Sequence, residues 1–263
     1  MLWPRVDDRR PFLIVLVGLV ALAWLALVVW GQSPYGRFLS HEALEDVQPG
    51  GGRYLATLLL FVGGWSMMTV AMMLPTSLPL VLLFRRLTQR RLDSALLVAL
   101  LIAGYLSAWV AFGAVAHVGD LAVHRGIEQA RWLEERAWVL GAATLALAGL
   151  YQFAPLKYHC LDKCRSPFSF IVEHWHGQGE ATQAFRLGVH HGIFCVGCCW
   201  SLMLLMFAVG VGNVGWMLAL GAAMGVEKNM PWGRRLSAPL GMALLAWSLS
   251  LVLVRTQVAG LPG

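Results

Sequence analysis

Long runs of apolar residues follow one another along most of the chain, and short stretches carrying arginine and lysine separate them. A helix needs about 20 apolar residues to cross the hydrocarbon core of a bilayer. The pattern therefore predicts an all-α protein, a polytopic transmembrane helical bundle with about seven spans. The predicted spans cover residues 11–30, 55–84, 94–116, 137–156, 187–209, 213–228 and 237–254.

The sixth predicted span is the shortest, and it ends in the charged pair Glu227-Lys228, so a bundle of six spans is the alternative. The first span follows Arg9 and Arg10. Its apolar run exceeds the 7–15 residues typical of a signal peptide, which indicates a retained anchor. Because no repeat or long linker divides the sequence, we expect a single membrane-embedded domain over residues 1–263.

The basic residues predict the orientation of this bundle. Fourteen of the twenty lysines and arginines fall in the N-terminus and in the segments 85–93, 157–186 and 227–236, and six fall on the other side. Short cytoplasmic loops of membrane proteins carry an excess of lysine and arginine. We therefore expect a cytoplasmic N-terminus and, for seven spans, a C-terminus on the opposite side.

Composition supports a membrane protein. The chain is 58% hydrophobic and 13% charged, whereas soluble domains carry about 25% charged residues. A net charge of +6 would point to nucleic acid in a soluble protein, but basic loops facing an anionic membrane surface account for it here. The expected partner is thus the lipid bilayer, and no nucleic acid is expected.

Soft metal ligands gather in the fifth predicted span. Four of them recur every four residues and so share one helical face: His191, Cys195, Cys199 and Met203. Cys198 flanks this face. Thiolates and thioethers select Cu(I), and imidazole serves copper and zinc alike. The alternative is that cysteine and methionine simply fill space in the core.

A methionine cluster lies in the second span, within "WSMMTVAMMLP": Met68, Met72 and Met73. Pro75 follows it and predicts a kink, because proline removes a backbone hydrogen bond whose freed carbonyl then needs a new partner. The cluster lies at a depth similar to that of the cysteines in the fifth span, so we expect the two helices to share one ion. Ordinary core packing by methionine is the alternative.

A third cluster, "YHCLDKCRSP", contains His159, Cys160 and Cys164. The two cysteines are four residues apart and share a helical face. The predicted orientation puts them on the cytoplasmic side of the membrane, where thiols stay reduced. Further along, His174 and His176 would complete a zinc site in sequence terms. Zinc is therefore the alternative metal for this segment, and an inert basic loop is the alternative to any site.

These segments together resemble a bacterial family of predicted metal-binding integral membrane proteins, called domain of unknown function 2182 and described as copper-chaperone-like. The resemblance covers residues 60–235 and is carried by "WSMMTVAMMLP", "YQFAPLK", "CLDKCRSP", "GVHHGIFCVGCCWSLM", "NVGWM" and "EKNMP". It implies a multi-pass protein of the bacterial cytoplasmic membrane that binds a soft metal, with copper first. It implies no established reaction, so we do not expect an enzyme.

The leading hypothesis is a Cu(I)-binding membrane protein that holds metal or delivers it to a membrane or extracytoplasmic copper enzyme. One alternative is a structural subunit of a larger membrane complex. Another is a thiol-disulfide oxidoreductase using the C-x-x-C pair Cys195 and Cys198. Against it, no cation lies within a helical turn of either cysteine in the sequence, and reactive thiols need one nearby. The pair Glu227-Lys228 is interpreted as a cytoplasmic helix end, with a buried ion pair as the alternative.

Overall fold

The computed structural model describes residues 9–32, 52–128, 138–176, 179–209 and 213–259, and all its regular elements are helical. The predicted all-α class is confirmed. In chain order the elements are α1 (Arg9–Gln32), α3 (Gly52–Met72), η3 (Pro75–Ser77), α4 (Leu78–Thr88), α5 (Ser94–Glu128), α7 (Trp138–Tyr151), α8 (Pro155–Arg165), α9 (Pro167–His174), α10 (Glu180–Val209), α11 (Val214–Asn229), η4 (Gly233–Leu236) and α12 (Ser237–Ala259).

Several of these helices are long and apolar enough to cross a membrane. Within the described residues there are four, in α1, α5, α10 and the segment Gly233–Gln257, and two bent pairs raise the number to six. The bent pairs are α3 with α4, at 45°, and α7 with α8, at 63°. With 16 residues, α11 does not reach this length. A multi-span helical protein is therefore supported, and the seventh span stays a prediction.

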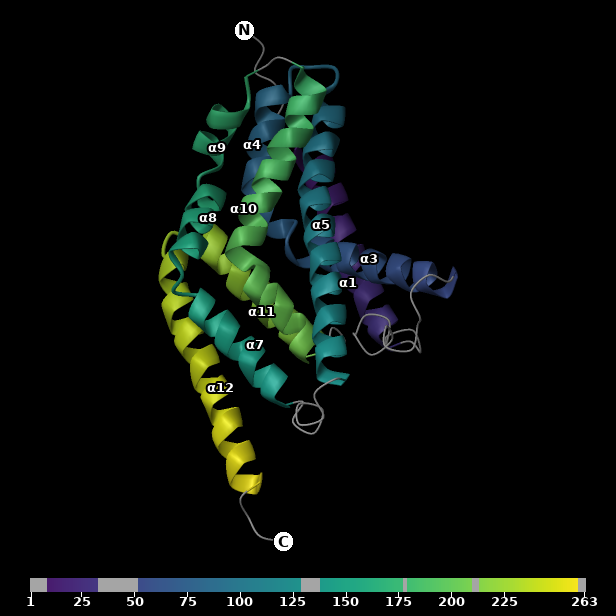
Figure 1. Cartoon of the computed structure of the whole chain (residues 1–263). Helices are drawn as coiled ribbons and strands as arrows, with labels where there is room; N and C mark the ends of the chain where they lie inside the picture. The colour runs from purple at the N-terminus through teal and green to yellow at the C-terminus, as the bar shows by residue number, and fades with distance from the viewer. Residues whose placement is uncertain (1–8, 33–51, 129–137, 177–178, 210–212, 260–263) are drawn as a thin grey trace.

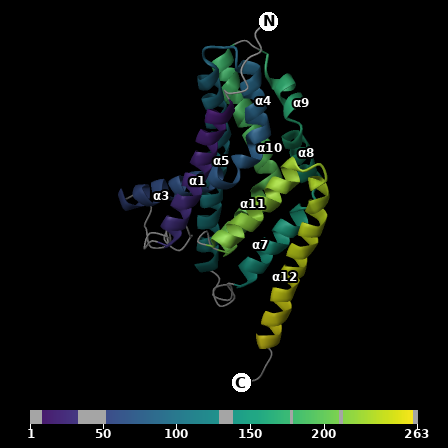
Figure 2. The same ribbon diagram turned by 180° about the vertical axis from the view of Figure 1, so that it is seen from behind.

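The helix α10 occupies the centre of the bundle and packs most extensively against α5 (Figures 1 and 2). It also contacts α7, α8, α9 and α11. In the apolar stretch of α10 that is long enough to cross a membrane, 56% of the residues are buried inside the protein. The corresponding share in α1 is 17%. Residues on α10 can therefore meet partners from most of the other helices, whereas α1 is peripheral.

Glycines allow the backbones of α5 and α10 to touch. A Cβ atom at Gly188 of α10 would collide with the carbonyl oxygen of Leu101, and one at Gly104 of α5 would collide with that of Phe185. One turn after Gly188, a Cβ at Gly192 would lie 2.6 Å from the Cβ of Ala108. Small residues four apart are the usual means by which membrane helices approach closely.

The kink predicted from Pro75 is confirmed between α3 and α4. Proline has no backbone N–H, so the carbonyl of Ala71 loses its usual helical partner. The indole Nε1 of Trp24 on α1 donates to that carbonyl instead, at 3.1 Å. Two residues on, the carbonyl of Met73 accepts from the hydroxyl of Tyr105 on α5, at 3.2 Å. Neighbouring helices thus satisfy the polar groups that the break exposes.

The segment 157–186, expected to be a cytoplasmic loop, is largely helical, and the side of the membrane on which it lies stays a prediction. It consists of α8, α9 and the start of α10, and Lys157 in it is fully buried. Lys228 is buried as well, at 5% exposure. Removing these two lysines from the fourteen basic residues leaves twelve against six. The charge bias keeps its direction, but residues 1–8 lie outside the described part, so the cytoplasmic N-terminus stays a prediction.

Substituting Gly188 by alanine should destabilise the bundle, because the added methyl group meets backbone that cannot rotate away. We expect a loss of about 1–3 kcal/mol, as for overpacked cores, measured as a lower midpoint of thermal unfolding in detergent. The matched control is Gly63→Ala on α3, where an added Cβ has no neighbour within 4 Å. Equal midpoints for the two variants would contradict the close contact.

Cysteine labelling should report the orientation. In Figures 1 and 2 the turn between α4 and α5 lies at one end of the molecule and the end of α12 at the other. An impermeant maleimide added outside should label Gln257→Cys and spare Gln89→Cys. Wild type is the blank, since four native cysteines are buried and Cys164 is partly buried. Labelling of Gln89→Cys from outside would reverse the predicted orientation.

Candidate functional site

Sulfur-containing side chains from three parts of the chain belong to one large buried apolar cluster. Eight of the side chains singled out by the sequence belong to a single apolar cluster, none more than 6% exposed, and Cys164 packs against it. We call these nine residues the sulfur core: Met68, Met72, Met73, Cys160, Cys164, Cys195, Cys198, Cys199 and Met203. The helices α3, α8 and α10, with Met73 just after α3, therefore contribute soft side chains to the same apolar cluster.

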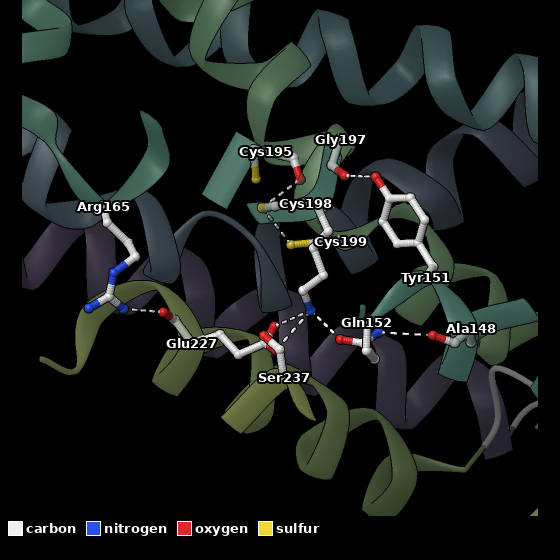
Figure 3. Close-up of polar contacts among 11 residues, drawn as sticks. Ala148, Tyr151, Gln152, Arg165, Cys195, Gly197, Cys198, Cys199, Glu227 and Ser237 are labelled. Carbon is white, nitrogen blue, oxygen red and sulfur yellow. Dashed lines mark hydrogen bonds and ion pairs between the residues drawn. The ribbon is translucent and has the colours of Figure 1, made fainter. Parts of the chain in front are cut away.

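Thiols of α8 and α10 face one another on one side of this core. The missing side chain of Gly197 admits Cys160, because a Cβ there would lie 2.5 Å from the Cys160 Sγ. The Sγ of Cys198 lies 3.2 Å from that of Cys199 and 4.0 Å from that of Cys164. All five cysteines are free thiols. The C-x₃-C pair of α8 thus meets the cysteines of α10. Figure 3 shows the three cysteines of α10.

Cys195 has a different, polar set of neighbours. Its Sγ lies 3.0 Å from the hydroxyl of Tyr105 and 2.8 Å from the ammonium of Lys228. Lys228 also donates to Thr76 Oγ1 of η3, at 3.2 Å. The sequence-based expectation that no cation lies near the C-x-x-C pair is therefore wrong, because α11 brings one from 33 residues away. Tyr105, which also bonds to Met73, links the break in α3 to Cys195.

A buried ion pair lies beside the sulfur core. The ammonium of Lys157 on α8 contacts both carboxylate oxygens of Glu227 on α11, at 2.8 and 2.9 Å, and both side chains are at most 1% exposed. Ser237 donates to the same carboxylate at 2.7 Å, and Gln152 accepts from Lys157. Figure 3 shows Gln152, Glu227 and Ser237 converging there. Of the two interpretations of Glu227, the buried ion pair is correct, although its partner is Lys157 rather than Lys228.

The histidines divide between the interior and the surface. His191 is buried at 3% exposure, and its Nε2 lies 3.3 Å from Ser77 Oγ at the break of α3 and α4. By contrast, His159 is exposed and its ring lies against Phe194, 6.1 Å between centroids. The ring of His174 lies against that of His190, 4.9 Å between centroids. His191 thus lies one turn from the thiols, and His159 points away from them.

Among the residues that the structure describes, no three histidine, cysteine, aspartate or glutamate side chains are arranged to hold a metal ion. The zinc site that the sequence suggested around Cys160 and His174 is not formed. Thioethers are the remaining soft donors, and they line the same core. Buried sulfur with almost no carboxylate suits a soft monovalent cation better than a hard divalent one.

Sequence reasoning missed three polar participants: Tyr105, Lys157 and Thr76. For Lys157 a signal exists, since it falls in the first turn of the helix that Pro155 begins, within the apolar stretch "QFAPLK". Ionisable residues inside a membrane bundle are costly and often functional. For Tyr105 and Thr76 no sequence signal separates them from ordinary packing residues.

Comparison with known proteins supplies an independent line of evidence. No curated protein and no solved structure matches the chain. The family model described as PpoB2, copper chaperone, matches residues 62–251, which run from α3 into α12 and include the whole sulfur core. That match covers most of the chain, and the protein therefore belongs to the PpoB2 copper chaperone family.

Proposed function

We propose that this protein binds Cu(I) as cargo in the sulfur core and delivers it to a membrane or extracytoplasmic copper enzyme. The observation that carries the proposal is that eight of the nine cysteine and methionine residues are buried in one apolar cluster, with Cys164 packed against it. Thiolates and thioethers select Cu(I) over harder ions. Membership of a copper chaperone family supports the metal and the role.

The position of the core between broken helices supports loading and release. The break before Pro155 lies beside α10, and the break after Met72 reaches it through the contact of Ser77 with His191. Broken helices within a membrane commonly mark the sites where ions bind and leave. A site assembled from separate half-helices opens when one of them shifts, whereas a site on one rigid helix cannot.

The stripe on α10 offers a route for the cargo. His191, Cys195, Cys199 and Met203 are all buried, at 3% exposure or less. Successive members are about 6 Å apart along the helix axis, from its rise of about 1.5 Å per residue. Cu(I) binds only a few soft ligands at a time, so it can move along the stripe by exchanging one ligand for the next.

Thiol-disulfide exchange is a second candidate, favoured by one observation. A cation beside a cysteine is typical of reactive thiols, and Lys228 is 2.8 Å from Cys195. However, Cys195 is 0% exposed, and thiol exchange requires that a substrate disulfide reach the attacking sulfur. The role of a permanent subunit in a larger complex has no such contact in its favour.

The copper site should be shared between α3 and α10. Replacing Met68 and Met72 together by leucine should lower bound copper nearly as much as replacing Cys195 and Cys199 by serine. The combined variant should lose little more, because residues that act on one site are not additive. Copper per protein, measured after loading with Cu(I) under reducing conditions and desalting, gives the result.

The matched control replaces Met206 and Met217 by leucine. Both are 0% exposed and lie in the same apolar cluster, but neither belongs to the sulfur core as defined above. Leucine keeps volume and apolarity, so packing should cost less than about 1.5 kcal/mol per change. Copper losses that simply add across the two pairs, or an equal loss in the control, would contradict a shared site.

The two candidate functions also differ in their response to Cys198→Ser. A copper carrier should remain free of covalent partners when this cysteine is removed. An oxidoreductase should accumulate a mixed disulfide through Cys195, visible as a higher-mass species on non-reducing gels that collapses on reduction. Accumulation of that species in cells would replace the copper role with the redox one.

A further inference from the structure

The two buried lysines differ in how their charge is balanced. Lys157 faces the carboxylate of Glu227, so that pair is neutral. Lys228, at 5% exposure, faces no carboxylate in the part of the chain that the structure describes. Its contacts are the Cys195 thiol at 2.8 Å and the Thr76 hydroxyl at 3.2 Å. The sulfur core thus contains a buried cation whose charged neighbour can only be sulfur.

A buried cation without an opposite charge is strongly unfavourable. The hydroxyl of Thr76 supplies a dipole and no charge, which leaves the sulfur of Cys195 as the balancing group. Cys195 is also one of the four residues of the α10 stripe, along which the cargo moves in the proposed function. The ammonium of Lys228 therefore lies against a sulfur that a metal would take.

From this contact we propose that Lys228 is the resident cation of the sulfur core and selects a monovalent cargo over divalent metals. The proposal deepens the proposed function and rests on it. Without cargo, the ammonium pairs with Cys195; with cargo, Cu(I) held by the thiolates of Cys195 and Cys199 leaves one net negative charge, which the ammonium balances while it keeps its bond to Thr76. Lys228 is a positioning and selectivity residue and does not bind the metal itself.

The selectivity follows from charge alone. Two thiolates and one Cu(I) together carry one negative charge, which the single ammonium of Lys228 neutralises. A divalent ion brings a second charge, and its repulsion from the nearby ammonium is twice that of a monovalent ion at the same distance. Because the core is buried and poor in water, this repulsion is screened far less than at a surface. Thiolates alone would not provide the same discrimination, since they also bind zinc tightly.

The geometry of α11 holds the ammonium in place. Lys228 lies in the last turn of this helix, where the dipole favours a positive charge. The neighbouring Glu227 is anchored to Lys157, and its carbonyl accepts from Arg165. These contacts attach the end of α11 to α8. The helix therefore cannot move away and carry the ammonium of Lys228 out of the core.

The test compares Cu(I) and Zn(II) binding by the purified full chain in detergent. Competition with a chromogenic chelator for each metal gives two dissociation constants and their ratio. In Lys228→Gln, which removes the charge, the preference for Cu(I) over Zn(II) should fall at least tenfold. Lys228→Arg keeps the charge and should keep the ratio. The control Arg90→Gln removes one positive charge from an exposed turn and should leave the ratio unchanged.

A second neutral variant, Lys228→Met, covers the case in which glutamine prevents folding. Methionine adds a soft donor that favours Cu(I), so a shift toward Zn(II) there would come from the lost charge alone. An unchanged ratio in a neutral variant that still binds Cu(I) would overturn the role of Lys228 and leave the proposed function intact. Wild-type protein that binds no Cu(I) would overturn both.

Discussion

The structure depends on one constraint, the direct backbone contact between α5 and α10. In lipid there is no hydrophobic force between helices, so close packing must hold them together. Gly104 and Gly188 provide it, since neither position leaves room for a side chain. This contact fixes the rotation of α10 about its axis. The face with His191 and Cys195 consequently turns into the bundle, toward Tyr105 and the break of α3.

The breaks in the other helices also determine which side chains meet α10. Ser77, at the break between α3 and α4, contacts His191 of α10, and Cys160, just after the break between α7 and α8, lies against Gly197 of α10. Proline ends the regular hydrogen bonding in both cases, at Pro75 and before Pro155. The buried lysines Lys157 and Lys228 each contact a residue of one of these breaks, Gln152 and Thr76 respectively.

Much of the architecture could be predicted from the sequence, because it depends on patterns within short stretches of the chain. Apolar run length indicated the helices, Pro75 indicated the kink, and the four-residue spacing indicated the face shared by Cys195 and Cys199. The same spacing argues against His159 as a ligand, since it precedes Cys160 by one residue and so points about 100° away from it. Contacts such as Lys228 with Cys195 depend on how distant helices cross. Hydrophobic periodicity contains no information about crossing.

The hydrogen bond from Trp24 to Ala71 gives the first helix a role in the structure of the broken span. The region matched by the family, 62–251, begins after α1, yet α1 supplies the donor that closes the open carbonyl of the broken span. That carbonyl is two residues from Met73, whose own carbonyl is held by Tyr105. Two hydrogen bonds, at carbonyls two residues apart, thus place the broken span between the peripheral helix and Tyr105, the neighbour of Cys195. The first helix therefore completes the hydrogen bonding of the break, although it lies outside the region that the family model matches.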